Sequence, residues 1–71
     1  MTTQTFAVTG MTCDHCVRAV TEELQALAGV TLVSVDLHPG GASHVTVDAE
    51  RQIADAEVAD ALDEAGAYAL A

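Results

Sequence analysis

The sequence predicts one small α+β domain, in which two helices cover one face of a four-stranded antiparallel sheet. Its 71 residues leave room for a single hydrophobic core. The period of the apolar residues also switches several times between two and about 3.6, in the order strand, helix, strand, strand, helix, strand. A chain of this length buries both helices most simply on the same face of the sheet. We therefore treat residues 1–71 as a single domain.

The N-terminal part of the chain predicts a strand followed by a helix. Residues 3–9 alternate in polarity and place Phe6 and Val8 on one face, as a strand does. From Cys16 onward the apolar residues follow helical spacing, and Gly29 is expected to cap the C-terminus of this helix. The apolar stripe consists of Val17, Val20, Leu24 and Leu27.

The middle of the chain predicts a β-hairpin. Residues 30–37 alternate, and their apolar members fall on one face. Residues 38–41, His-Pro-Gly-Gly, favour a turn, and Val45 and Val47 continue the alternation beyond it.

The C-terminal part predicts a second helix and a short edge strand. Asp55 lies where a helix needs an N-cap acceptor, and Gly66 is expected to stop the helix. The apolar positions between them are Val58, Leu62 and Ala65. Tyr68 and Leu70 are left for an edge strand. The complete order is that of a ferredoxin-like βαββαβ sandwich.

This topology gathers three connections at one end of the sheet. They are the loop after the first strand, the turn of the hairpin and the segment after the second helix, and the first helix also points its N-terminus there. Five residues with reactive or ligating side chains are expected at this end: Cys13, Cys16, His38, His44 and Tyr68.

The charge of the chain excludes several classes of partner. Eleven carboxylates stand against two arginines and no lysine, which gives a formal charge of -9 and a pI near 4.2. Nucleic acid and anionic membrane surfaces are therefore poor partners. No apolar run is long enough to span a bilayer, and residues 1–6 lack the features of a signal peptide. We expect a cytoplasmic protein without direct membrane insertion.

The cysteine pair Cys13 and Cys16 is the most informative feature of the sequence. Two cysteines so close together do not staple a domain, and in a reducing compartment such a pair indicates metal binding or redox activity. A helix N-terminus favours thiolates. Two thiolates suit a soft ion such as Cu(I) better than Zn(II), which prefers four ligands. The open positions of such a site would let a partner's thiolate take the ion.

The loop Gly10-Met11-Thr12-Cys13-Asp14-His15-Cys16 resembles the Gly-Met-Thr-Cys-x-x-Cys signature of the heavy-metal-associated domain family. The resemblance covers nearly the whole chain, which is similar to bacterial cytosolic copper chaperones of that family. It implies Cu(I) as the cargo. It also implies the metal-binding domains of a copper-transporting P-type ATPase, or a copper-responsive repressor, as partners. The chain would then be a monomer, or a copper-bridged dimer, and not an enzyme.

The residues around the cysteines refine what this resemblance implies. Thr12 favours copper, because zinc- and cadmium-handling relatives tend to carry aspartate at that position. Met11 is expected to pack inward beneath the loop, and Asp14 to face solvent. His15 is a candidate third donor, although a solvated histidine is the simpler interpretation.

Residues farther along the chain carry weaker expectations. His38 and His44 are either weak donors at the metal end or a plain surface pair, and Arg18 either softens the charge of a dithiolate complex or is an ordinary exposed arginine. Family members usually place a tyrosine directly after the glycine that ends the second helix. Here Ala67 intervenes, and because a one-residue shift in a strand reverses the side chain, we expect Tyr68 not to shield the site.

The sequence therefore predicts a copper chaperone that ligates Cu(I) through Cys13 and Cys16 and transfers it by ligand exchange. Two alternatives stay open. One is a Zn(II) or Hg(II) carrier or regulatory metal-binding module, and the other is a small thiol-disulfide oxidoreductase that uses the same cysteines.

Overall fold

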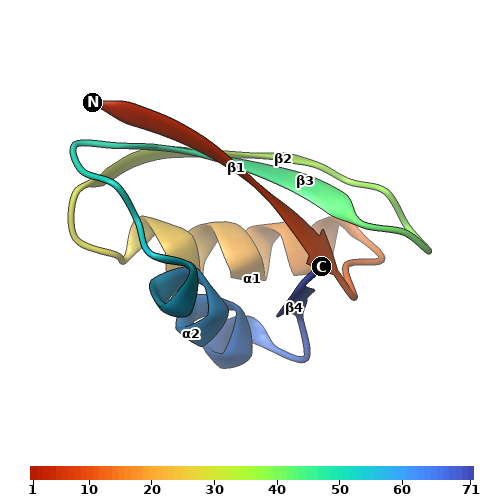
Figure 1. The fold of residues 1–71 in the computed structure, drawn as a ribbon. Coiled ribbons are helices and arrows are strands. Elements are labelled where there is room, and N and C mark those ends of the chain that lie inside the picture. The colour runs from red at the N-terminus through yellow and green to blue at the C-terminus, as the bar shows by residue number, and fades with distance from the viewer.

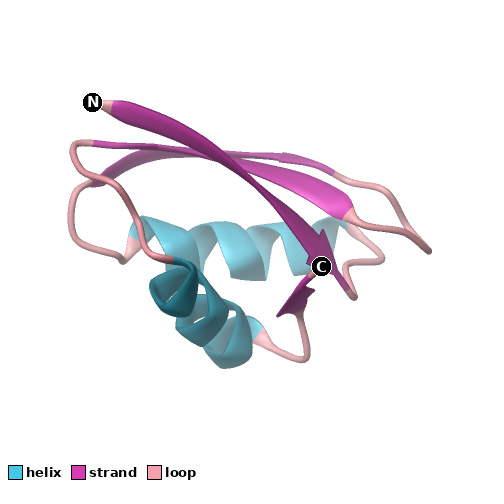
Figure 2. Ribbon diagram, in the orientation of Figure 1, coloured by secondary structure: helices cyan, strands magenta, loops and turns pink.

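A computed structural model describes residues 1–71, which form one four-stranded sheet with two helices on one of its faces (Figures 1 and 2). The elements are β1 (Thr2–Thr9), α1 (Asp14–Gln25), β2 (Val30–Asp36), β3 (Ser43–Ala49), α2 (Asp55–Ala65) and β4 (Ala69–Leu70). The strands lie in the order β2-β3-β1-β4, and each pair of neighbours is antiparallel. The predicted ferredoxin-like fold is confirmed.

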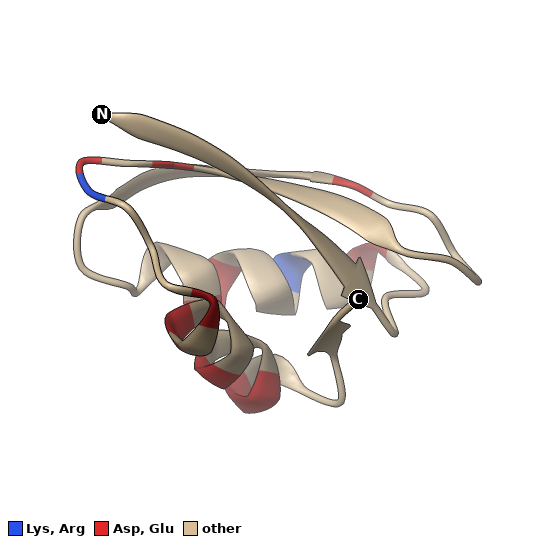
Figure 3. Cartoon of the chain, in the orientation of Figure 1, with Lys and Arg blue, Asp and Glu red and all other residues tan.

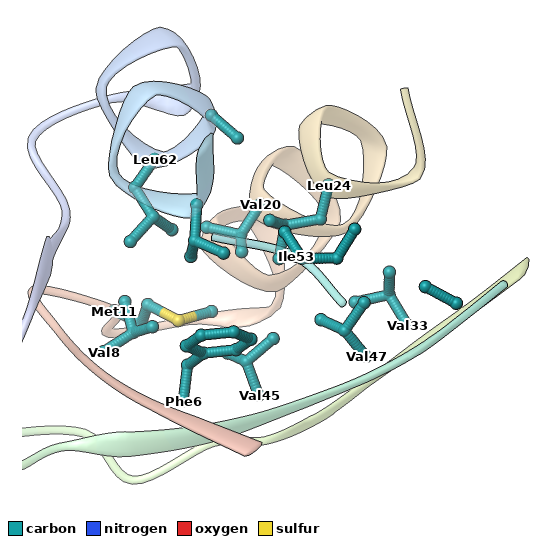
Figure 4. Packing of buried hydrophobic residues seen from close by; sticks show 13 residues of the cluster. Phe6, Val8, Met11, Val20, Leu24, Val33, Val45, Val47, Ile53 and Leu62 are labelled. Carbon is teal, nitrogen blue, oxygen red and sulfur yellow. The ribbon is translucent and has the colours of Figure 1, made fainter. Parts of the chain in front are cut away.

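The core lies between the sheet and the two helices (Figure 4). The pairing of β1 with β3 sets Phe6 opposite Val45, so that their side chains share the inner face of the sheet. The buried apolar residues are Phe6, Val8, Met11, Val20, Leu24, Val33, Val45, Val47, Ala49, Ile53, Val58, Ala61 and Leu62. The alternation and the helical stripes of the sequence therefore identified the buried faces correctly. No helix is both long enough and apolar enough to cross a bilayer.

The first helix ends earlier than the sequence predicts. It stops at Gln25, with Ala26 as its C-cap, and not at Gly29. Two tight turns follow, in which the Leu27 N–H donates to the carbonyl of Leu24 and the Val30 N–H to that of Leu27. Gly29 serves this turn instead, with a φ of +85° that directs the chain into β2.

The start of the second helix and the last strand also differ from the prediction. Ala54 is the N-cap of α2, and Asp55 is its first residue. Alanine has no acceptor side chain, so the Glu57 N–H donates to the Ala54 carbonyl at 3.0 Å, while the Glu57 carboxylate accepts from the Ala54 N–H at 3.0 Å. At the C-terminal end, Tyr68 precedes β4 and does not belong to it.

Candidate metal-binding site

The cysteine loop connects β1 to α1 and is anchored from below. Met11 is 1% exposed, and its thioether points into the core beside Val8 and Phe6 (Figure 4). Gly10 has a φ of +95°, and a Cβ on it would lie 3.0 Å from the carbonyl oxygen of Ala67. The loop therefore needs glycine where the backbones approach, and the predicted inward packing of Met11 is confirmed.

The two sulfurs lie side by side at the surface. Cys13 is exposed, Cys16 is half-buried, and both are reduced. Their Sγ atoms are 3.8 Å apart, well beyond the roughly 2.05 Å of a disulfide. One ion bonded to both sulfurs at about 2.3 Å, a usual metal–thiolate length, fits between them. The geometry suits two thiol ligands for one metal ion.

Hydrogen bonds to Cys16 favour its thiolate. They lower the pKa of Cys16 from 9.0 to about 6, and the backbone N–H of Thr12 makes the largest contribution. The hydroxyl of Tyr68 comes next, while partial burial opposes the shift; the Thr12 hydroxyl, 3.8 Å from the sulfur, adds to it. The surroundings of Cys16 therefore favour its thiolate over its thiol. Cys13 occupies the N-cap of α1, and its carbonyl accepts the first bonds of the helix.

Tyr68 lies at the end of the sheet where the sequence placed it, and it reaches Cys16 although the one-residue shift argued against its usual role. Hydrogen bonding between its hydroxyl and the Cys16 sulfur lowers the pKa of Cys16 and raises the pKa of the phenol. The rule that a one-residue shift reverses a side chain holds inside a strand, but residues 66–68 lie outside one. The ring instead lies over Gly66, where a Cβ would be 2.9 Å from the ring atom Cε2, and beside Gly10.

The ionisable neighbours of the cysteines are all exposed. Asp14 and His15 are the first two residues of α1. Within 4.8 Å, neither joins the two sulfurs in a set of three potential ligands. Arg18 is exposed and forms no salt bridge. His15 as a third donor stays a prediction.

The turn of the hairpin reaches the same end of the sheet as the cysteine loop, as predicted. The two histidines of the hairpin contact each other there. Residues 40–42 and residues 9–12 line one open pocket of about 320 Å³ between the turn and the cysteine loop. The rings of His38 and His44 are 5.5 Å apart, and a carboxylate oxygen of Asp36 lies 3.1 Å from His38 Nε2. The structure thus groups the histidines with Asp36, an aspartate that the sequence did not single out, and not with the cysteines.

Comparisons with known proteins agree with this geometry. Residues 5–67 match the model of a family described as the heavy-metal-associated domain. The chain belongs to this family. A heavy-metal-associated relative from Bacillus subtilis (strain 168), named copper chaperone CopZ, is 38% identical over 66 residues, which cover 93% of each chain. Another protein of that name, from Staphylococcus saprophyticus, is 37% identical over 67 residues, covering 93% of this chain and 94% of that one.

A solved structure of the family also matches the fold. It is named CopZ metallochaperone and has a TM-score of 0.81 and 30% sequence identity, covering 99% of this chain and 100% of that chain. The family that the Gly10–Cys16 signature indicated is therefore confirmed, together with the ferredoxin-like architecture of the heavy-metal-associated domain.

Proposed function

We propose that this heavy-metal-associated domain is a copper chaperone, which holds Cu(I) between Cys13 and Cys16 and acts in the cytoplasm. The observation that carries the proposal is the pair of sulfurs 3.8 Å apart at the surface, with no third histidine, cysteine or carboxylate grouped with them. Two thiolates satisfy a soft d10 ion, whereas they leave Zn(II) two ligands short. The names of the relatives support copper as the cargo.

Release of the ion follows from the same low ligand count. A thiolate of a partner can bond to a Cu(I) ion held by two sulfurs, and one of the two original sulfur–copper bonds then breaks. Cys13 is the more exposed sulfur, so a partner can approach the ion from its side. Hydrogen bonds from Thr12 and Tyr68 lower the pKa of Cys16 and so favour its thiolate. The protein thus moves an ion between ligands and catalyses no covalent reaction.

The partner we propose is a metal-binding domain of a copper-transporting P-type ATPase, with a copper-responsive repressor as the second choice. Acidic residues outnumber basic ones by 11 to 2 and recur along α2 (Figure 3), and the formal charge is -9. We therefore expect the docking face of the partner to be basic, and the association rate to fall steeply with added salt. Stopped-flow mixing at several ionic strengths measures this, and a rate independent of salt would contradict it.

Copper-edge X-ray absorption of the loaded protein tests the ligand set. We expect two sulfur neighbours for each copper, and loss of tight Cu(I) binding in the Cys13→Ala/Cys16→Ala variant. His15→Gln is the matched control, because it changes a neighbouring residue. A nitrogen signal that disappears in His15→Gln would make His15 a third donor. Tight binding that survives loss of both cysteines would refute the proposal.

Two further measurements separate the alternatives. Competition among Cu(I), Zn(II) and Hg(II) identifies the preferred ion, and preference for Zn(II) would replace copper as the cargo. The lowered pKa of Cys16 is also typical of thiol-disulfide oxidoreductases. Catalytic turnover of a disulfide substrate by the metal-free protein would favour that function over the chaperone.

A further inference from the structure

The outer face of the hairpin carries a cluster that the copper proposal does not use. Asp36, at the end of β2, lies directly opposite His44 of β3 in the antiparallel register. His38 follows two residues after Asp36. One potential ligand atom from each of the three residues lies within 4.8 Å of the others, and all three side chains are exposed. We propose that Asp36, His38 and His44 form a second metal site, for a borderline divalent ion such as Zn(II).

The spacing of the donor atoms fits a single ion. Zn(II) binds imidazole nitrogen and carboxylate oxygen at about 2.0–2.2 Å, so two donors on one ion at 90–110° are roughly 3.0–3.4 Å apart. His38 Nε2 and Asp36 Oδ2 are 3.1 Å apart. The imidazole of His44 is tilted by 60° at 5.5 Å from that of His38, and it offers a ligand atom within 4.8 Å of the other two donors.

The backbone beneath the cluster is well held. The His38 N–H donates to the hydroxyl of Ser43 at 2.9 Å, and Ser43 is 0% exposed. The His38 carbonyl accepts from the Gly41 N–H at 3.1 Å, which closes the turn. Asp36 and His44 are fixed by the strand pairing itself. An ion therefore meets a framework in which only side chains have to move, and this limits the entropy lost on binding.

The chemistry of the donors selects the class of ion. Two imidazoles and one carboxylate suit Zn(II), Ni(II) or Cu(II), whereas two thiolates suit Cu(I). Both cations of the chain are elsewhere: Arg18 is on α1 and Arg51 is in the connection before α2 (Figure 3). The net charge of -9 also attracts cations. The two sites would thus hold different ions at the same end of the sheet.

The pair of His38 and Asp36 adds little to folding, because both side chains are more than half exposed. Substitutions in the cluster should therefore leave the fold intact. An ion bound to all three side chains would instead stabilise the fold, since any ligand that binds only the native state raises the melting temperature.

Zinc chloride titrated into the Cys13→Ser/Cys16→Ser variant tests the proposal without the cysteine site. We expect one equivalent of Zn(II) to bind by calorimetry, to shift the amide NMR signals of Asp36, His38 and His44, and to raise the melting temperature. Adding His44→Gln should weaken binding at least about tenfold, the loss seen even for outer-sphere partners of metal ligands. His15→Gln in the same background is the matched control and should leave the affinity unchanged.

Three results would overturn the second site. One is the absence of saturable binding at millimolar zinc, and another is binding that survives both His38→Gln and His44→Gln. The third is a loss in His15→Gln as large as that in His44→Gln. Since both cysteines are absent from these proteins, the outcome is independent of whether the cysteine loop carries copper.

Discussion

The two ends of the sheet use their polar side chains differently. In the connection from β3 to α2, polar side chains bind one another, whereas at the cysteine loop they surround the sulfur of Cys16. The guanidinium of Arg51 bonds both carboxylate oxygens of Glu57, at 2.8 and 2.9 Å, and the carbonyl of Ala28 at 2.9 Å. Gln4 bonds both the carbonyl and the N–H of Ile53, at 3.0 and 2.7 Å. These groups bond one another within the protein, which stabilises the fold, whereas the buried hydroxyl of Thr2 at the same end has no partner.

The cysteine loop at the other end is arranged differently. Thr12 and Tyr68 act on Cys16, while Cys13 is exposed beside it. These contacts stabilise a thiolate but leave its bonding to a metal or partner free. The comparison indicates that one end of the sheet secures the fold and the other prepares a ligand. Substitutions should therefore separate the two roles, except where the loop depends on the core.

Met11 is the point where the loop depends on the core, and it should give the largest effect. Met11→Ala removes a side chain that is 1% exposed, so we expect a loss of about 2–5 kcal/mol in the free energy of unfolding. Leu32→Ala is the matched control, because Leu32 is 54% exposed. Chemical denaturation measures both. Equal losses in the two variants would mean that the loop is not anchored through Met11.

Gly10 should give the next largest effect. Alanine there meets both a φ of +95° and the carbonyl oxygen of Ala67 at 3.0 Å, whereas Gly40 has a similar φ of +83° and no atom within 4 Å. We expect Gly40→Ala to cost about 1–2 kcal/mol from the backbone conformation alone, and Gly10→Ala to cost more. Denaturation of the two variants separates the steric contribution, and equal costs would show that this close approach relaxes easily.

Tyr68 tests the electrostatics of the loop with little effect on the fold. Tyr68→Phe removes the hydroxyl that helps lower the pKa of Cys16 to about 6. The pKa should rise but stay below 9.0, since the Thr12 N–H contributes most. In a Cys13→Ser background, alkylation by iodoacetamide should therefore become slower near pH 6, because only the thiolate reacts.

Thr12→Ala is the control for this experiment. It removes a hydroxyl that contributes less than that of Tyr68 and keeps the backbone N–H. The midpoint of the alkylation profile should move less than in Tyr68→Phe. If Tyr68→Phe leaves the midpoint unchanged, the tyrosine does not act on the sulfur.

The outcome for Tyr68 shows how far the sequence could predict the site. The cysteine pair, the inward Met11 and the faces of the strands could be predicted, because each depends on the spacing of residues that are close together in the sequence. Tyr68 depends on where β4 begins, and a side-chain parity argument fails one residue outside a strand. The meeting of Asp36 and His44 depends on the register across a turn. Such contacts between distant residues leave no local pattern.

The smallest expected effect is at the opposite end of the sheet, at Glu57. Arg51, and then the Ala54 N–H, lower the pKa of Glu57 from 4.5 to about 2. The charged carboxylate therefore stabilises the fold fully above pH 4.5, and this contribution is lost as the pH falls from 4.5 toward 2. Glu57→Gln should be slightly less stable than the parent protein at pH 7, with a difference that shrinks toward pH 2. The effect is small because both partners are partly exposed.

Glu64→Gln is the control for this last experiment, because Glu64 lies on the same helix, is exposed and forms no salt bridge. Its stability difference from the parent protein should vary less with pH than that of Glu57→Gln. Denaturation at several pH values between 2 and 7 compares the two variants. Copper binding should be unchanged in Glu57→Gln, since this residue lies at the end of the sheet remote from the cysteines. Weaker copper binding by Glu57→Gln would mean that the two ends of the sheet are coupled through α2, and it would contradict the view that they have separate roles.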